Sequence, residues 1–450
     1  MKRLAFLGMA AVLAAAPASS AAPPRVCAEC VRTNEARLAG DEFAGRGCGS
    51  AGENAAARFL AAQLKAYGLA GAAPDGGFLQ TVQFRESTYR EPPTLEVGGL
   101  RMVQGGEILA VQTAPEIIAP LARVGLADVD AAAGKVALYD APYDLKAVSL
   151  FLKAGARAVI TQAPDRALRS WSQIAARSPD GVQVLGVDAE PPPVADHALV
   201  FVRPEAMAAL NAAEGQTARL LAPRGEPVLH TTYNVLARLP GRGPQADREA
   251  VLLTAHYDHL GLVAGQTYRG ANDDASGTSA VLEFARMLAQ APPHRRTAQF
   301  ALFGCEEAGG HGAKYFLSHP SAPLADVAVN LEFEMIGAVD PRHPKRLMLT
   351  GWERSNLGPA LEAHGAAIGP DIDPDEHFFE RSDNIQLARR GVVAQTISAW
   401  PKPPTYHQPS DDLAHLDQAF MIHVIQSLAG PVDWLLNSDF KPAWNPGGQP

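Results

Sequence analysis

Five short segments between residues 255 and 412 carry the residue types from which metal-dependent hydrolases are built. They read AHYDHLG, RGANDDASG, FGCEEAGG, NLEFEMIG and YHQPSDD. Together they offer two histidines and four carboxylates, namely His256, His407, Asp273, Glu306, Glu307 and Glu334. A mixed set of imidazole nitrogens and carboxylate oxygens favours zinc over calcium or magnesium. The set therefore predicts a two-metal site with hydrolytic chemistry.

Most of these segments follow a short apolar run, which is typical of a buried parallel strand. Strands are expected at 251–255, 298–304, 327–333 and 391–398, and helices at 53–67, 276–289 and 417–436. This alternation predicts an α/β fold with a mostly parallel, mixed sheet flanked by helices. Ligands in such sheets gather at the carboxyl ends of strands, so we expect the distant segments to meet there.

Residues 93–225 have a different sequence pattern, in which short stretches typical of β-strands are separated by proline and glycine. Strands are expected at 135–139 and 158–161, and a helix at 144–154. This stretch carries no metal-like cluster, so we interpret it as an inserted, β-rich domain that shapes substrate access or binds a partner. It divides a catalytic domain into residues 30–92 and 226–438, and the proline- and glycine-rich residues 440–450 are expected to form a loose tail.

The first 21 residues have the pattern of a secretory signal peptide: Lys2 and Arg3, then an apolar stretch, then small residues. We therefore expect an exported protein, either periplasmic or secreted. Removing Lys2 and Arg3 would change the formal net charge from -9 to -11. Such an acidic chain is a poor partner for nucleic acid or an anionic membrane surface, and stable membrane association is not expected.

The four cysteines are Cys27, Cys30, Cys48 and Cys305. In an exported protein they can form one or two disulfides, with three possible ways of pairing all four. The Cys27-x-x-Cys30 spacing also occurs in redox motifs. However, the pair lies near the mature N-terminus, outside the strand and helix context of a redox enzyme, so a disulfide is favoured.

The ordered set H-x-D, N-D-D-A-S-G, E-E, E-M-I-G and Y-H resembles the co-catalytic di-zinc exopeptidases, a family that includes aminopeptidase Y, bacterial leucyl aminopeptidases and glutamate carboxypeptidase. The resemblance covers residues 30–92 and 226–435, including the N-terminal stretch LAGDEFAGRG that starts at Leu38. The insert resembles the protease-associated domain that many members carry. The resemblance implies two Zn²⁺ per chain and peptide substrates with a free N-terminus.

Carried over to this sequence, the resemblance implies one zinc held by His256, Asp273 and Glu334, and another held by Asp273, Glu307 and His407. Asp273 would bridge the two ions, because a carboxylate has two oxygens. Three further residues are expected to take part in catalysis. Glu306 would act as the general base, Asp258 would orient the His256 imidazole, and Tyr406 would donate a hydrogen bond to the developing oxyanion.

Two departures from the family pattern affect these assignments. Glu334 stands where the family usually has aspartate before Met-Ile-Gly, and Glu332 is a second candidate for that ligand. Asn384 follows Arg381-Ser382-Asp383 where the family often has histidine, which concerns substrate contacts. The remaining histidines His259, His311, His377 and His415 are interpreted as ordinary core or surface residues.

Other functions on the same fold remain open from sequence. They include a carboxypeptidase or dipeptidase, a cyclase of N-terminal glutamine, and a non-catalytic binding ectodomain. Serine-nucleophile chemistry is disfavoured because no Gly-x-Ser-x-Gly motif occurs, and helix-borne zinc proteases are disfavoured because His-Glu-x-x-His is absent. An acidic pocket of Glu306, Glu334 and Asp383 would favour an aminopeptidase, because it could face the ammonium group of a free N-terminus.

Overall fold

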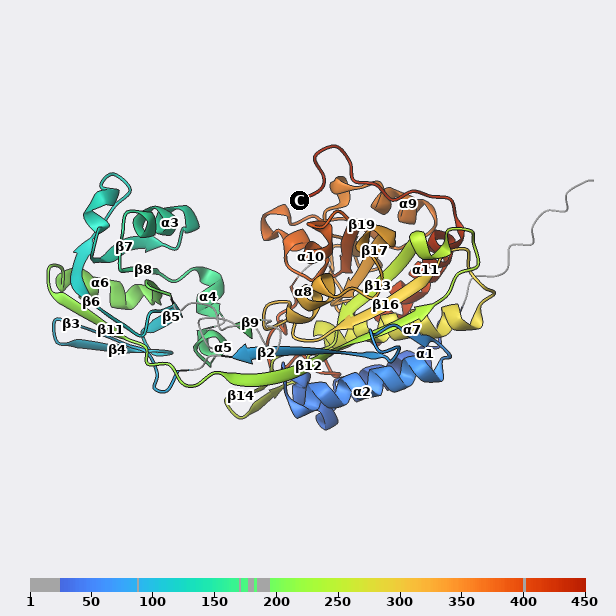
Figure 1. Cartoon of the computed structure of the whole chain (residues 1–450), viewed down its shortest axis with the longest axis horizontal. Coiled ribbons are helices and arrows are strands. Elements are labelled where there is room, and N and C mark those ends of the chain that lie inside the picture. The colour runs from blue at the N-terminus through green and yellow to red at the C-terminus, as the bar shows by residue number, and fades with distance from the viewer. Residues whose placement is uncertain (1–24, 87–88, 170, 177–181, 184–194, 400–401) are drawn as a thin grey trace, which may run out of the picture.

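The chain forms two lobes, and strands β2 (Leu79–Glu86) and β12 (Val228–Leu239) extend from the larger lobe toward the smaller one (Figure 1). The computed structural model describes residues 25–86, 89–169, 171–176, 182–183, 195–399 and 402–450. The expected signal peptide, residues 1–21, lies outside the described residues.

The larger lobe is built on a ten-stranded mixed sheet with the order β19-β18-β20-β17-β13-β16-β12-β2-β9, with β1 paired to β12. Its centre is parallel, because β13 pairs in parallel with β16 and β17, and β17 pairs in parallel with β20. The α/β prediction is confirmed. Besides β2 and β12, the strands of this sheet are β1 (Ala70–Gly71), β9 (Val182–Gln183), β13 (Ala250–His256), β16 (Ala298–Phe303), β17 (Val327–Glu334), β18 (Leu347–Leu349), β19 (Ile368–Pro370) and β20 (Val393–Ser398).

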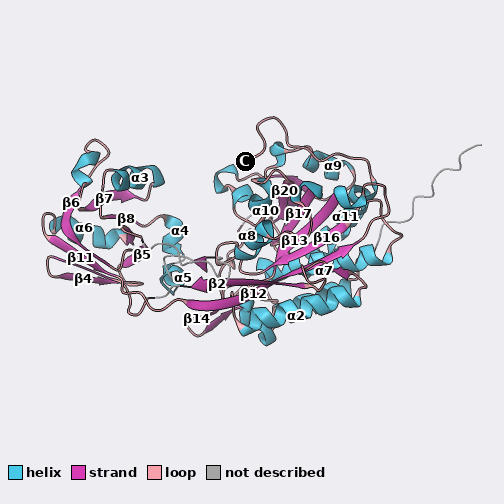
Figure 2. Ribbon diagram, viewed as in Figure 1, coloured by secondary structure: helices cyan, strands magenta, loops and turns pink. Residues whose placement is uncertain are grey.

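Helices cover both faces of this sheet (Figure 2), which explains why its central strands carry apolar residues on both faces. In β13, Val251 and Leu253 point into a core with one set of helices, whereas Leu252 points into a core with another set. The first set is α1 (Ala28–Leu38), α2 (Ala51–Ala66), α7 (Ser276–Gln290), α9 (Leu357–Ala363) and α11 (Gln418–Asn437), and the second is α8 (His311–Ser318) and α10 (Asn384–Ala388).

The smaller lobe contains an eight-stranded sheet with the order β4-β3-β11-β6-β7-β8-β10-β5. Its strands are β3 (Thr94–Val97), β4 (Leu100–Val103), β5 (Ile108–Gln112), β6 (Glu116–Arg123), β7 (Val136–Pro142), β8 (Ala158–Gln162), β10 (Ala198–Val202) and β11 (Thr217–Leu221). Its helices are α3 (Leu145–Lys153), α4 (Asp165–Arg169), α5 (Trp171–Ala176) and α6 (Pro204–Ala212).

The C-terminal residues are not the loose tail that their composition suggested. The amide of Asn445 donates to the Arg354 carbonyl, and Asn356 exchanges hydrogen bonds with the backbone of Lys441 and Ala443. The Trp444 ring packs edge-on against Phe379 at 6.2 Å. Side-chain packing and backbone hydrogen bonds thus fix a segment that its proline and glycine content alone would leave free.

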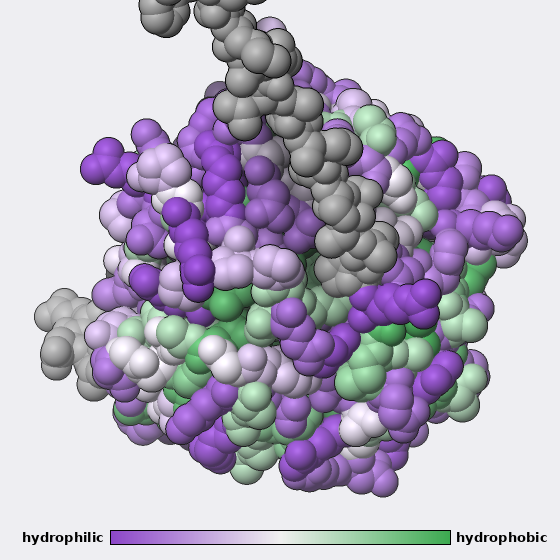
Figure 3. Space-filling model, turned by 90° about the vertical axis from the view of Figure 1, so that its right-hand side faces the viewer, coloured by the Kyte–Doolittle hydropathy of each residue, from purple (hydrophilic) through white to green (hydrophobic). Residues whose placement is uncertain are grey.

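Helix α11 is the one described helix that is long and apolar enough to cross a membrane by length and composition. Its apolar residues pack instead into the core beneath the main sheet, with Val424, Leu428 and Leu435 fully buried or nearly so. The surface at this end of the molecule mixes hydrophilic and apolar residues (Figure 3), which is ordinary for folded proteins.

Candidate functional site

The expected site residues come from neighbouring strand ends. His256 is the last residue of β13, Glu334 is the last residue of β17, and Glu306 and Glu307 follow the end of β16. Because these three strands are adjacent and parallel, their carboxyl ends share one edge of the sheet. Asp273 reaches this edge from the turn before α7.

The first group of possible metal donors consists of His256, Asp273 and Glu334. One donor atom from each residue lies within 4.8 Å of the others. The His256 Nε2 atom is 3.3 Å from Asp273 Oδ1, and among the described residues it has no hydrogen-bond partner. His256 is only 1% exposed, so solvent cannot readily satisfy this nitrogen. A bound cation would satisfy both the nitrogen and the facing carboxylates.

The second group lies on the other oxygen of Asp273. The Oδ2 atom is 3.2 Å from His407 Nε2, and that nitrogen is 3.0 Å from Glu307 Oε1. The two oxygens of Asp273 therefore face two different histidines. This is the arrangement that a bridging carboxylate needs between two metal ions. Nitrogen and oxygen donors of this kind fit zinc.

His259, which we had interpreted as an ordinary histidine, belongs to this second group. Its Nδ1 atom lies 3.0 Å from Glu307 Oε1 and 3.9 Å from Asp273 Oδ2. The residue is 1% exposed. Although Nδ1 is close to Glu307, neither ring nitrogen has a hydrogen-bond partner of suitable geometry within the described part of the chain. The sequence signal was present, because His256 and His259 stand three residues apart in one segment. Judged as an isolated histidine, His259 did not stand out.

The turn that carries Asp273 is held by two other carboxylates. Asp411, from the YHQPSDD segment, accepts hydrogen bonds from the backbone amides of Asn272 (2.8 Å) and Asp273 (3.0 Å). Asp274 accepts from the amides of Gly277 (2.9 Å) and Met335 (3.0 Å), which ties the start of α7 to the residue after Glu334. Asp273 is thus a possible metal donor, whereas Asp411 and Asp274 hold the backbone around it.

Gly270 allows this turn to pass close to His259. Its φ is +57°, a conformation that residues with a side chain rarely adopt. A Cβ atom at this position would lie 2.1 Å from the Asp273 carbonyl oxygen and 2.4 Å from His259 Cγ. Glycine at 270 is therefore required by both backbone conformation and packing.

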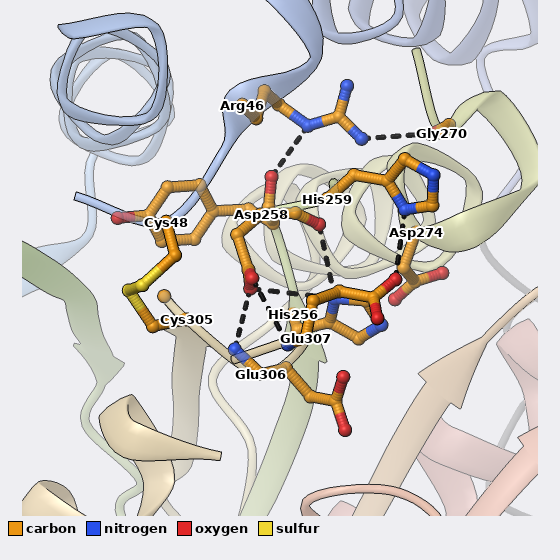
Figure 4. Close-up of polar contacts among 12 residues, drawn as sticks. Arg46, Cys48, His256, Asp258, His259, Gly270, Asp274, Cys305, Glu306 and Glu307 are labelled. Atoms are coloured by element: carbon orange, nitrogen blue, oxygen red, sulfur yellow. Dashed lines mark hydrogen bonds and ion pairs between the residues drawn. A yellow bond between two sulfur atoms is a disulfide. The ribbon is translucent and has the colours of Figure 1, made fainter. Parts of the chain in front are cut away.

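Asp258 acts more on the loop of Glu306 and Glu307 than on His256. Its two carboxylate oxygens accept from the amides of Glu306 (2.8 Å) and Glu307 (3.2 Å), as Figure 4 shows. The closest approach of that carboxylate to His256 Nδ1 is 3.7 Å, whereas the Asp258 carbonyl oxygen is 3.3 Å from the same nitrogen. The backbone of Asp258 is thus nearer to the imidazole than the side chain expected to orient it.

Glu306 belongs to neither donor group, although it lies beside Glu307. In Figure 4 its carboxylate extends away from Asp258. Burial raises the pKa of Glu306 well above its ordinary value; His256 lowers it, and nearby carboxylates, Asp383 foremost, raise it further. A carboxylate whose pKa is raised is a stronger base, which suits it to proton transfer.

Tyr406 and Glu332 both lie near the donor groups, but Tyr406 lines a cavity whereas Glu332 is held by hydrogen bonds in the protein interior. The Tyr406 ring stacks on His407 at 3.9 Å and lines a small cavity together with Glu334. Glu332 is fully buried and accepts hydrogen bonds from the Asn384 amide and from Thr396 Oγ1. Glu334, and not Glu332, therefore lies in a donor group, while Asn384 serves to fix Glu332.

Two of the other histidines, His311 and His415, belong to neither donor group. His311 is 3% exposed and stacks against the Phe84 ring at 5.6 Å, and burial lowers its pKa to about 4. His415 is exposed, and its Nδ1 lies 2.8 Å from Asp412 Oδ1. Both fit the interpretation made from sequence.

The N-terminal segment is joined to the site by hydrogen bonds and by a disulfide. The fully buried guanidinium of Arg46 donates to the carbonyl oxygens of Leu38, Tyr257, Arg269 and Gly270 at 2.6–2.8 Å. Two residues later, Cys48 forms a disulfide with Cys305, which directly precedes Glu306 (Figure 4). The other two cysteines, Cys27 and Cys30, also form a disulfide.

Comparison with known proteins agrees with this fold. Residues 234–430 match the sequence profile of peptidase family M28. Aminopeptidase YwaD of Bacillus subtilis is 28% identical over 180 residues, and leupeptin-inactivating enzyme 1 of Streptomyces exfoliatus is 34% identical over 169 residues. These alignments cover 38% and 36% of this chain, but only 37% and 34% of those two relatives.

The fold resembles solved structures over almost the whole chain. The aminopeptidase from Aneurinibacillus sp. strain AM-1 superimposes with a TM-score of 0.66 at 23% identity, covering 92% of this chain and 95% of that one. A zinc aminopeptidase from Bacillus subtilis gives a TM-score of 0.61 at 20% identity, covering 92% of this chain and 96% of that one. We conclude that the part of the larger lobe formed by residues 234–430 belongs to peptidase family M28.

Proposed function

We propose that this protein is an exported, zinc-dependent aminopeptidase that removes N-terminal residues from peptides. The observation that carries the proposal is the pair of donor groups that share Asp273 within the family M28 domain. The aminopeptidases among the similar proteins support the reaction class.

His256, Asp273 and Glu334 would hold one zinc ion, and Asp273, Glu307 and His407 would hold the other. When bound, the two ions supply a water molecule of lowered pKa and polarise the scissile carbonyl. Glu306 takes a proton from the attacking water and delivers it to the departing amine, and its position beside the donor groups supports this role. The Tyr406 hydroxyl donates a hydrogen bond to the oxyanion that develops on the carbonyl oxygen.

An acidic pocket supports recognition of a free amine. Glu306 and Glu334 lie beside Asp383, which is 2% exposed and whose Oδ2 atom has no hydrogen-bond partner among the described residues. A substrate ammonium group would give the Asp383 Oδ2 atom a hydrogen-bond donor and would place a positive charge among these carboxylates. An acetylated N-terminus would bring neither the charge nor the donors.

The remaining parts of the proposal concern location and the insert. The two disulfides support an oxidising compartment, in agreement with the signal-like N-terminus. We assign the insert, residues 93–225, as a protease-associated-like domain that shapes access to the site. In support, Val111 and Phe201 of the insert line one cavity together with Tyr406 and His407.

Metal content and substrate choice test this function directly. Purified protein is expected to contain two zinc ions per chain and to hydrolyse aminoacyl-anilides with free amines but not acetylated ones. Cleavage of blocked peptides from the carboxyl end would favour a carboxypeptidase, and one zinc with cyclisation of N-terminal glutamine would favour a cyclase. Absence of both metal and activity would favour a binding ectodomain.

The role of Glu306 can be tested separately from metal binding. Glu306→Gln is expected to retain the wild-type zinc content and to lower kcat by roughly 100-fold or more, because the amide cannot take up the proton. The matched control is Glu380→Gln, which replaces an exposed carboxylate outside both donor groups. Undiminished turnover in Glu306→Gln with intact zinc would rule out Glu306 as the base.

A further inference from the structure

A large cavity lies between the inserted domain and the site edge of the catalytic domain. Its volume is about 760 Å³. The insert contributes an apolar wall that includes Val111, Ile174 and Phe201, and the catalytic domain contributes Tyr406 and His407. His407 belongs to the second donor group, so the cavity leads to the place where the bond would be cleaved.

Three cations and one carboxylate also line this cavity. Arg381 Nη1 lies 3.0 Å and Lys402 Nζ lies 2.6 Å from the same oxygen of Glu376. Arg169 of α4 is the third cation, and its charge also acts on Glu376. The side chains of Arg381 and Lys402 are 34% and 27% exposed, so both can reach a ligand. One carboxylate leaves this group with a surplus of positive charge.

Arg381 and Lys402 also line the smaller cavity beside Glu334, together with Met335, Phe378 and Tyr406. These cations therefore stand where both cavities meet, next to the donor groups. Arg381 therefore lies beside Glu334 and Tyr406.

We propose that Arg381 and Lys402 bind a carboxylate group of the peptide substrate and so direct the enzyme toward acidic or very short peptides. The proposal rests on the aminopeptidase function proposed above. A guanidinium binds a carboxylate through two parallel hydrogen bonds, and an ammonium adds a third charged donor. The carboxylate is either the acidic side chain of the N-terminal residue or the C-terminus of a dipeptide.

Kinetics with paired substrates test the proposal and separate the two sources. Glutamyl-anilide against leucyl-anilide measures the effect of an acidic side chain, and Leu-Ala against Leu-Ala-amide measures the effect of a free C-terminus. In the wild type, kcat/KM is expected to be higher for the carboxylate-bearing member of at least one pair. Arg381→Gln is expected to lower that ratio about tenfold or more, because a charged hydrogen bond is lost.

Lys402→Gln is expected to lower the same ratio by a smaller factor, and Arg381→Lys is expected to recover part of it. The matched control is Arg390→Gln, which replaces an exposed arginine that follows α10 and lines neither cavity. It is expected to leave both members of each pair unchanged. An equal loss on both members in Arg381→Gln, or equal wild-type rates within both pairs, would overturn carboxylate recognition.

Calorimetric titration distinguishes failure of this proposal from failure of the proposed function. Leu-Ala and Leu-Ala-amide, and the dipeptide Glu-Ala against Gln-Ala, are titrated into the zinc-loaded Glu306→Gln and Glu306→Gln/Arg381→Gln variants. Tighter binding of the peptide with the additional carboxylate, lost with Arg381, supports the proposal whether or not the wild type turns over. Equal affinities within both pairs overturn it, even where leucyl-anilide hydrolysis establishes an aminopeptidase.

Discussion

Buried carboxylates that bind backbone amides set the positions of the donor residues around Asp273. Asp411 holds the amide of Asp273 itself, and Asp258 holds the amides of Glu306 and Glu307. A carboxylate that accepts two backbone hydrogen bonds fixes a loop more firmly than one side-chain contact would. Residues outside the donor groups therefore determine their geometry.

His259 offers a test of how far the second donor group extends. In His259→Ala the affinity for the second zinc ion is expected to fall by about 10- to 100-fold, whether Nδ1 binds the ion or positions Glu307. The measurement is zinc content by elemental mass spectrometry after dialysis against graded chelator, with His415→Gln as the exposed control. Zinc retention equal to that of the wild type would mean that His259 is an ordinary core histidine with no part in binding the second zinc ion.

At the scale of elements, apolar runs predicted the strands that carry the site to within a few residues. The expected strand 327–333 is observed as Val327–Glu334, and the expected helix 276–289 as Ser276–Gln290. These predictions hold because a strand buried on both faces is mostly apolar, although β17 also buries Asn330 and Glu332. Helix α6 was not anticipated, although Pro204 suits the first turn of a helix, because its hydrophobic periodicity is weak.

The approach of His259 to Glu307 and the ordered C-terminal residues could not be predicted in the same way. His259 depends on Gly270, in another segment, leaving space beside its ring. The C-terminal residues depend on contacts of Trp444 with Phe379 and of Asn445 with Arg354. Such contacts join residues of different segments, and local sequence pattern carries no information about them.

The disulfide between Cys48 and Cys305 links the N-terminal segment to the loop of Glu306. Replacing both cysteines with serine is expected to destabilise the fold by about 2–4 kcal/mol and to lower kcat. The destabilisation arises because the bond closes a loop with a sequence separation of 257 residues, and the loss of turnover because the loop before Glu306 is released. Thermal unfolding and anilide hydrolysis measure the two effects.

The natural control is Cys27→Ser/Cys30→Ser, because that disulfide spans a sequence separation of only 3 residues, far along the chain from the site. Its removal is expected to change stability much less and to leave kcat unchanged. Equal effects of the two double variants would contradict a positioning role for the Cys48–Cys305 bond.

At the scale of the whole molecule, charge is distributed unevenly between the two sides of the site. The chain has a formal net charge of -9, and buried carboxylates crowd the strand ends. The cavity beneath the insert instead carries the surplus cations Arg169, Arg381 and Lys402. A peptide dipole with an ammonium group at one end and a carboxylate at the other would match this arrangement.

The buried Glu35 makes the stability of the whole fold depend on pH. Burial raises its pKa to about 8, and the nearby Ser279 hydroxyl and Arg46 charge lower it to a lesser extent. Between the ordinary value of 4.5 and about 8, the folded state keeps a proton that the unfolded state has released. The contribution of Glu35 is therefore fully present below pH 4.5 and is lost as pH rises through about 8, with a slope of up to roughly 1.4 kcal/mol per pH unit.

Glu35→Gln removes this titration, so its free energy of unfolding is expected to rise relative to that of the wild type as pH increases from about 5 to about 8. Urea unfolding of both proteins at several pH values in this window measures the difference. The control is Glu29→Gln, which replaces an exposed residue on the same helix α1 and measures the effect of a glutamate-to-glutamine change away from the buried position. A difference for Glu35→Gln that is constant across the window would mean that Glu35 is already ionised in the folded protein, held by the Arg46 charge despite its burial.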